Sequence, residues 1–396
     1  MKLINKNLIL SLVTIITLSA CGGGSDESTT QTNNSNTSNP GISNNTTITG
    51  QFLSSNDTGK FYSTEQMPSY QQYGKNASHC YQSYNDYYFE TENTMVFGNP
   101  DLPDTDFKQA AQWVENNFNT ALTTMAISKA EYFSNRYSVR LVGLKHIRNQ
   151  LSSRYYDTID YPNNFDALTY DQQVDWATKT AKSLTKNEAV ELLVNDPYSP
   201  FQTETQTVLE DKIYVCLHEK NTTNGWGEGS LSGITIGAPS LAIPHEVEKI
   251  VTHELIHTIQ HALSANFEGL GLPRWYSEGQ AVLLSGMEVA KKSDHNEYDP
   301  TLVVSYYDET GDQAIAYSHY GLAYQYLKDA NGQPSIVNMM KDMKRITYNY
   351  SQQKNSTLKE FHGYVESFDK LMKQTNASTL TVQQYRDEYH ALMSAY

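Results

Sequence analysis

One short segment holds two histidines and a glutamate at a spacing that could bind and use a metal ion. Residues 252–257 read THELIH. In a helix, residues four positions apart lie on the same face, one turn apart, so His253 and His257 can direct two imidazoles at one Zn²⁺. Glu254 lies beside them and can take a proton from a water molecule that the metal acidifies. The pattern predicts a zinc site with an adjacent general base.

A long amphipathic helix is expected to position this segment. Residues 244–265 carry apolar side chains at helical spacing and leave a separate face for the histidines. Two other His-Glu pairs, at positions 218 and 245, have no His three residues after the Glu. His261 continues the stripe of histidines, but each helical turn rises about 5.4 Å. Three histidines of one straight helix cannot all reach one ion, so we expect His261 to be structural.

A catalytic zinc site also needs a third protein ligand and one open position. Glu278 is the predicted third ligand. It lies in the segment LPRWYSEGQA at 272–281, where a second helix can return toward the metal after two glycines have ended the first. Glu268 is the alternative, although it lies on a predicted loop, just before the glycines at 269 and 271.

Together these segments resemble the gluzincin clan of zinc metallopeptidases, which includes thermolysin and the aminopeptidases related to leukotriene hydrolase. The pattern His-Glu-x-x-His at 253–257, followed by Pro-x-Trp-x-x-Glu-Gly-x-Ala at 273–281, carries the resemblance. The Trp-Glu-Gly part is also similar to bacterial collagenases. The resemblance implies Zn²⁺-dependent hydrolysis of peptide bonds. It also implies an α+β, zincin-like fold: a small twisted sheet with the active-site helix, followed by a mainly helical C-terminal lobe.

The resemblance further implies a tyrosine that donates a hydrogen bond to the oxyanion of the tetrahedral intermediate. Residues 317–321 read YSHYG and, with Gly332-Gln333-Pro334, resemble the aminopeptidase segment that carries this donor. The donor then falls on Tyr317. His319 and Tyr320 are the alternatives.

Residues 231–238 alternate in the pattern of a strand, directly before the metal helix. In the clan, the edge strand before that helix pairs with the extended substrate backbone. The residues predicted to bind the substrate main chain are therefore Ile234, Thr235, Ile236 and Gly237. Two features of the clan are missing: the Gly-Ala-Met-Glu-Asn box of the aminopeptidases, and a carboxylate one turn after the third ligand, where Val282 stands.

The N-terminus predicts export and lipid anchoring. Two lysines precede an apolar run at 8–18 that is too short to span a bilayer. The run ends in Leu-Ser-Ala-Cys at 18–21, which resembles the lipobox of bacterial lipoproteins and implies cleavage before Cys21 and acylation of that residue. Gly22, rather than Asp, follows the cysteine and favours the outer membrane. We expect a bacterial cell-envelope protein that is tied to the bilayer through acylated Cys21.

The predicted signal peptide covers residues 1–20, and composition and sequence patterns divide the rest of the chain into three parts. Residues 21–50 are nearly all Gly, Ser, Thr and Asn and predict a flexible tether. Residues 51–265 should form an α+β part with the sheet, a helical insertion and the metal helix. Residues 266–396 should form a helical lobe that supplies the third ligand. Cys80 and Cys216 remain in the mature chain and predict one disulfide.

Local patterns predict the individual elements. Strands are expected at 94–97, 212–217 and 231–238, and helices at 104–125, 244–265, from near 273 and after 314. Residues 127–195 are expected to be mainly helical, and 225–229 to form a glycine-rich turn. Residues 50–92 have no clear pattern.

The formal net charge of −15 excludes nucleic acid as a partner, because no basic surface for phosphates is available. Two other functions remain open. One is a catalytically silent, zinc-binding surface lipoprotein with a binding or adhesive role, and the other is a surface module that uses some of the 29 tyrosines to bind glycans or peptides. Glu254 favours the peptidase, because a structural zinc needs no base. The sequence predicts a peptide or protein substrate but neither its identity nor the oligomeric state.

Overall fold

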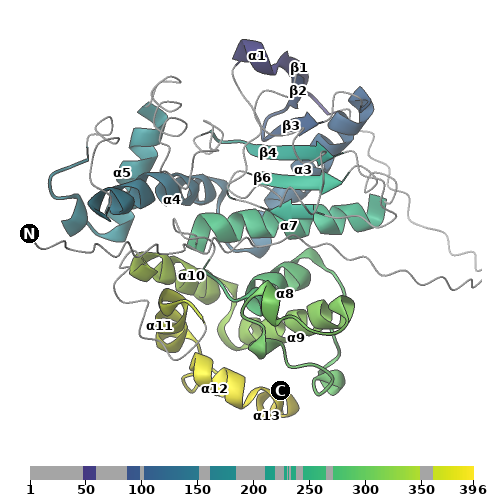
Figure 1. Ribbon diagram of the computed structural model, residues 1–396, viewed down its shortest axis with the longest axis vertical. Coiled ribbons are helices and arrows are strands. Elements are labelled where there is room, and N and C mark those ends of the chain that lie inside the picture. Colours follow the sequence, from purple (N-terminus) through teal and green to yellow (C-terminus); the bar gives the residue numbers. More distant parts are fainter. Residues whose placement is uncertain are drawn as a thin grey trace, which may run out of the picture.

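The computed structural model describes residues 48–58, 87–98, 102–150, 161–183, 210–218, 227–229, 231, 233–237, 244–264, 271–347 and 360–396. The fold is α+β, with a small mixed sheet and a larger share of helix (Figure 1). The predicted signal peptide, Cys21, most of the tether, Cys80 and Glu268 lie outside the described residues. The predicted domain boundary near 265 lies outside them as well. None of the described helices has the length and apolarity that crossing a bilayer requires.

The sheet, as far as the structure describes it, has the strand order β1-β2-β3-β4-β6-β5. The strands are β1 (Gln51–Ser54), β2 (Tyr87–Glu90), β3 (Thr94–Gly98), β4 (Ile213–His218), β5 (Gly227–Gly229) and β6 (Gly233–Gly237). The three central strands β3, β4 and β6 are parallel. β2 and β5 flank them in antiparallel orientation, and β1 pairs with β2. The strands predicted at 94–97, 212–217 and 231–238 are confirmed, whereas β5 occupies the predicted turn.

Alternating residues of the strands form two apolar layers. Val96, Val215 and Ile234 belong to the main core, which α3 (Asp104–Thr124) and α7 (Pro244–Ser264) cover. The opposite face has its own apolar cluster, with members Tyr88, Met95, Phe97, Tyr214 and Cys216. Cys216 is disulfide-bonded. Since Cys80 lies outside the described residues, its pairing with Cys216 stays a prediction.

Most of the other regular structure in the described chain is helical. α1 (Ser55–Thr58) follows β1, and α4 (Lys129–Gln150) and α5 (Tyr170–Ser183) lie between β3 and β4 in the sequence. The C-terminal helices are α8 (Arg274–Ser285), α9 (Gln313–Asn331), α10 (Gln333–Thr347), α11 (His362–Leu371), α12 (Val382–Asp387) and α13 (Tyr389–Ala395). Figure 1 shows α7 between the sheet and these C-terminal helices. α7 therefore packs on both parts of the molecule.

A buried lysine joins the C-terminal helices to the N-terminal part. Lys344 on α10 donates to Ala262 O (2.8 Å) on α7, and to Ser138 Oγ (2.8 Å) and Asn135 O (3.1 Å) on α4. Its side chain is fully buried. Burial lowers the pKa of Lys344 well below the usual value, and the nearby Lys341 lowers it further. The three acceptors satisfy the three donors of an ammonium group, so this contact can hold α4, α7 and α10 together.

Two glycines allow α8 and α9 to pack in close contact. A Cβ atom at Gly279 would lie 2.2 Å from the carbonyl oxygen of Tyr320 on α9. A Cβ at Gly321 would lie 3.0 Å from Val282 Cγ1 on α8. The absence of a side chain at Gly279 thus determines how near Glu278, the preceding residue, stands to α9.

We expect Gly279→Ala to lower the free energy of unfolding by about 1–3 kcal/mol, because the added methyl group overlaps a backbone atom that cannot move away cheaply. Urea unfolding followed by circular dichroism measures the change. Ser285→Ala on the same helix is the matched control, and we expect it to stay within about 0.5 kcal/mol of the parent. Equal stability of Gly279→Ala and the parent would contradict the packing described above.

Candidate metal centre

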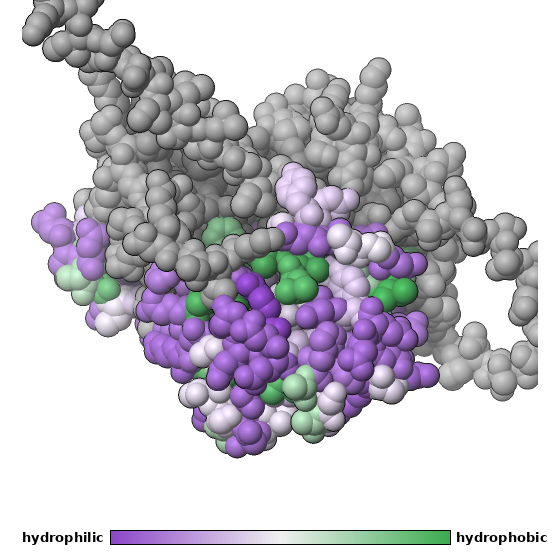
Figure 2. Space-filling view, turned by 60° about the horizontal axis from the view of Figure 1, so that its bottom comes forward, coloured by the Kyte–Doolittle hydropathy of each residue, from purple (hydrophilic) through white to green (hydrophobic). Residues whose placement is uncertain are grey.

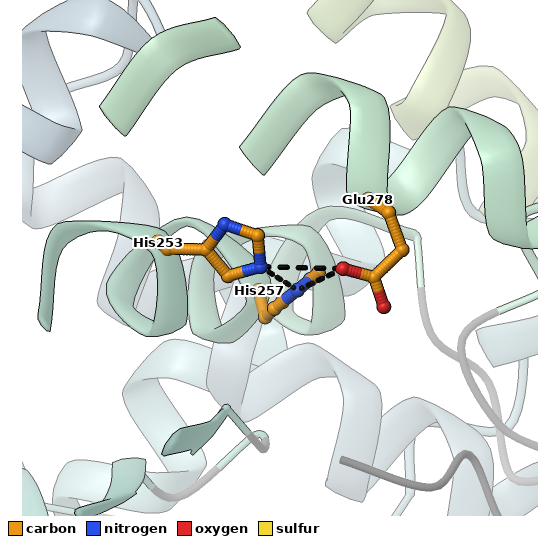
Figure 3. Close-up of side chains that lie close together, drawn as sticks. All are labelled: His253, His257 and Glu278. Carbon is orange, nitrogen blue, oxygen red and sulfur yellow. Dashed lines mark hydrogen bonds and ion pairs between the residues drawn. The ribbon is translucent and has the colours of Figure 1, made fainter. Parts of the chain in front are cut away.

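Three buried side chains from two helices direct their donor atoms at one another (Figure 3). His253 and His257 lie one turn apart on α7, and their Nε2 atoms are 3.0 Å apart. Glu278 on α8 places its Oε2 atom 3.2 Å from His253 Nε2 and 3.3 Å from His257 Nε2. These residues could hold a metal ion, and no other cluster of three or more His, Cys, Asp or Glu ligands is found in the described part of the chain.

The start of α8 determines where Glu278 stands. Gly271, just before this helix, has a φ of +71°, a conformation that favours glycine. The first amides of α8 then donate to a neighbouring loop: Arg274 N bonds Val304 O (2.9 Å) and Trp275 N bonds Val303 O (3.1 Å). With its first turn fixed in this way, α8 presents Glu278 to the histidines of α7. The structure brings together all three ligands that the sequence predicted.

A chain of uncharged groups orients His257. Its Nδ1 lies 2.8 Å from Gln260 Oε1. Gln260 Nε2 donates to Gln280 Oε1 (2.9 Å), Gln280 Nε2 donates to the hydroxyl of Tyr324 (2.6 Å), and that hydroxyl donates to Gln333 Oε1 (2.9 Å). The chain links α7, α8, α9 and the first residue of α10.

This chain also determines the tautomer of His257. Gln260 Nε2 donates to the carbonyl oxygen of Ser277 (2.8 Å), which can only accept. The amide oxygen of Gln260 must therefore face His257, and the proton of the neutral imidazole must sit on Nδ1. The lone pair of Nε2 is then directed at the metal site, as a metal ligand requires.

Charged groups surround the other ligand. Arg274 NH1 donates to Glu278 Oε1 (3.0 Å), the oxygen that faces away from the histidines. The same guanidinium donates through Nε to Glu309 and through NH2 to the hydroxyl of Tyr317 (2.8 Å). Burial raises the pKa of Glu278, but Arg274 and His257 outweigh it and hold that pKa well below its usual range. Glu278 is therefore ionised at neutral pH.

Arg274 was not predicted from the sequence, although it is one of the unspecified positions in the Pro-x-Trp-x-x-Glu-Gly pattern. It donates to Glu278 and so orients the third candidate ligand. Val282, one turn after Glu278, contributes to the packing of α8 against α9.

Of the three candidates for an oxyanion donor, Tyr317 lies next to the candidate metal ligands. Its ring is nearly parallel to that of His253, at 20° and 6.5 Å between centroids. His319 faces elsewhere, with Nδ1 2.9 Å from Ile315 O and Nε2 3.1 Å from Asp294 O. The hydroxyl of Tyr320 donates to Glu309 (3.3 Å).

Glu254, the residue predicted to act as general base, lies close to the candidate metal centre. Glu254 is buried on α7 beside the two histidines. Its carboxylate is close enough to raise the pKa of His257, together with that of Glu278. His261, one turn beyond His257, is buried and is not among the grouped ligands, as expected.

The prediction that β6 binds the substrate main chain is wrong for Ile234, Thr235 and Ile236. These residues pair with β4 on one side and with Gly229, Glu228 and Gly227 of β5 on the other, and Gly237 pairs with His218 of β4. β5 and β6 pair in antiparallel orientation before α7, and β5 is the outer strand of the two. In the described sheet, β5 is the outer strand on this side.

No protein-family model matches the chain, and no curated protein and no solved structure is significantly similar to it. Its function must therefore be argued from the site.

We expect the purified protein to bind one metal ion per chain with high affinity, and His257→Ala and Glu278→Ala to lose most of it, because each removes one of three ligands. Metal content after dialysis, measured by mass spectrometry of the elements, tests this. His261→Gln is the control and should keep its metal. Full metal content in Glu278→Ala would show that Glu278 is not a ligand.

Metal affinity should rise with pH. Burial lowers the pKa of His257, but the carboxylates of Glu278 and Glu254 outweigh it and raise this pKa from 6.5 to about 9. A metal ion must displace that proton, so the apparent association constant should increase roughly tenfold per pH unit and level off above about pH 9. Competition with a chromophoric chelator between about pH 7 and pH 9 measures it. An affinity that does not change over this range would contradict the assigned pKa.

Proposed function

We propose that this protein is a zinc-dependent peptidase of the gluzincin type, with a zincin-like fold, exported and anchored to the bacterial envelope through Cys21. The observation that carries the proposal is the convergence of His253, His257 and Glu278, with Glu254 beside them on the same helix. Two imidazoles and one carboxylate leave one of four positions open, which is the arrangement of catalytic rather than structural zinc.

The spacing and chemistry of the donors fit zinc. Zinc binds nitrogen and oxygen ligands at about 2.0–2.2 Å, so two ligands of a tetrahedral site lie about 3.3 Å apart. The three donor atoms are separated by 3.0, 3.2 and 3.3 Å. Two of them are imidazole nitrogens, which suit zinc, whereas Mg²⁺ and Ca²⁺ take oxygen ligands.

Zinc in this site would supply a Lewis acid for the scissile carbonyl and would acidify the attacking water. Glu254 takes the proton from that water and passes it to the leaving amine. Tyr317 donates its hydroxyl proton to the developing oxyanion. Because Arg274 donates to the oxygen of this hydroxyl, the proton of Tyr317 is available for that bond.

Arg274 has a second part in this arrangement. It bonds both Glu278 and Tyr317, which lie on different helices. The third ligand and the oxyanion donor are thus held by one rigid, buried group, and such fixed geometry is what a catalytic site needs.

The substrate backbone would bind to β5, the outer strand, in place of β6. The outer strand of a sheet can offer main-chain hydrogen bonds to an extended peptide. Gly227 and Gly229 of β5 have no side chains that would obstruct its approach.

We expect Glu254→Gln to keep one metal ion per chain and to lose at least about 10²-fold in hydrolysis, because the amide can replace the carboxylate in shape but cannot accept the proton. Cleavage of casein and of a peptide library, with a chelator-treated sample beside it, is the assay. Glu248→Gln, a partly exposed position on the same helix, is the control and should cleave like the parent. The proposal fails if Glu254→Gln cleaves peptides as well as the parent does.

A further inference from the structure

Exposed apolar side chains are concentrated in the connection between α8 and α9 and in the first turn of α9. Among the described residues, the large hydrophobic side chains with substantial exposure are Leu302 (55%), Tyr306 (44%), Tyr307 (82%) and Ile315 (43%). All four belong to residues 302–315. On the face that Figure 2 shows, hydrophobic residues form only small patches in a mainly hydrophilic surface. Such a concentration in one segment calls for a ligand, because single exposed apolar residues are usually scattered.

Internal hydrogen bonds hold this segment in place. Its backbone accepts from the first two amides of α8, at Val304 and Val303. Asp308 accepts from the amide and the hydroxyl of Ser305, both at 2.9 Å. Asp312 caps α9 by accepting from the amide of Ala314 (2.8 Å). The segment is ordered before any ligand arrives, which lowers the entropic cost of binding.

The aromatic side chains lead from the metal centre to the surface. The rings of Tyr317 and Tyr306 have their centroids 5.5 and 5.2 Å from the guanidinium carbon of Arg274. The ring of Tyr307 follows, 6.2 Å from that of Tyr306. Arg274 is 1% exposed and bonds the ligand Glu278, whereas the exposed fraction is 44% at Tyr306 and 82% at Tyr307. An aromatic surface therefore begins at Arg274, which bonds Glu278, and extends through Tyr306 to Tyr307 in the solvent.

We propose that Tyr306 and Tyr307, which we call the aromatic shelf, bind a large apolar or aromatic side chain of the peptide substrate close to the bond that is cleaved. This inference rests on the proposed function. Tyrosine rings offer large apolar contact area at a low cost in side-chain entropy. The carboxylates of the segment, at Asp308, Glu309 and Asp312, are used in internal bonds, so the shelf selects by apolar contact more than by charge.

Peptide binding to the Glu254→Gln protein tests the shelf without turnover. The probes are fluorescent peptides of one sequence, with Phe or Ser placed in turn at each position, and polarisation gives their dissociation constants. We expect Phe at one position to bind about tenfold more tightly than Ser. Tyr306→Ser with Tyr307→Ser should remove this preference and leave the affinity of the Ser peptides unchanged.

The control is Tyr396→Ser, the same change at a partly buried tyrosine that contacts Tyr326, Lys292 and Asp329. It should keep the preference. Metal content and thermal unfolding of each variant verify that the protein is folded. The same two substitutions are also made in the protein that keeps Glu254. There, the ratio of kcat/KM for the Phe peptide to that for the Ser peptide should fall, relative to the parent, by as much as the binding preference does.

Two outcomes overturn the inference. One is a Phe preference that is absent in the parent or that survives in the double variant. The other is shelf-dependent binding to phosphatidylcholine vesicles without any peptide preference, which would assign the shelf to a lipid surface. Failure of the proposed function would look different: the parent would bind the Phe peptide through the shelf but hydrolyse nothing.

Discussion

A buried carboxylate must be compensated by positive charge, and Glu278 is the carboxylate among the three candidate metal ligands. Transfer of an ionised carboxylate into a protein interior is costly unless it is paired and hydrogen-bonded. Here Arg274 bonds one oxygen of Glu278, and the other oxygen faces His253 and His257. In the metal-free protein, the raised pKa of His257 supplies a further positive charge. A metal ion in this candidate site would take over that role when the proton leaves.

The two sides of the site are built from different chemistry. His257 is hydrogen-bonded to a chain of side-chain amides and a hydroxyl, which determine its tautomer without adding charge. Glu278 forms an ion pair with Arg274, and Glu309 forms a second ion pair with the same guanidinium. A neutral partner leaves the imidazole less basic than a carboxylate would. The contacts of His257 and those of Glu278 both lead to α9 or to the segments beside it. Gly279 permits α9 to pack closely on α8. The position of α9 therefore affects His257 and Glu278 together.

Local patterns in the sequence were enough to predict the elements that carry the ligands. The spacing of His253 and His257 needs a helix, and the apolar residues around them specify the same helix, so the two signals agree. The loop of Gly271 and the motif around Glu278 predicted the returning helix. The partners of these residues were not predictable. Arg274 bonds Glu278, and Gln260 bonds His257 and α8. These contacts depend on how α8 packs against α7, and no local sequence pattern predicts that packing.

The strand β5 shows why the sequence placed β6 at the edge of the sheet. Its residues Gly227–Gly229 carry no alternation of apolar side chains, because a short outer strand is held by main-chain pairing with β6. β1 and β2 pair with each other although more than 30 residues separate them in the sequence, so no local pattern predicts this pairing. Lys344 likewise had no signal, since a buried lysine that binds carbonyl groups of two other helices resembles any surface lysine in the sequence.

Anomalous diffraction at the zinc absorption edge, from crystals of protein loaded with one equivalent of Zn²⁺, would test the central claim directly. The account predicts one strong peak about 2.0–2.2 Å from His253 Nε2, His257 Nε2 and a carboxylate oxygen of Glu278, with a non-protein ligand completing the tetrahedron. A peak that leaves out Glu278, or four protein ligands around the ion with no open position, would contradict it.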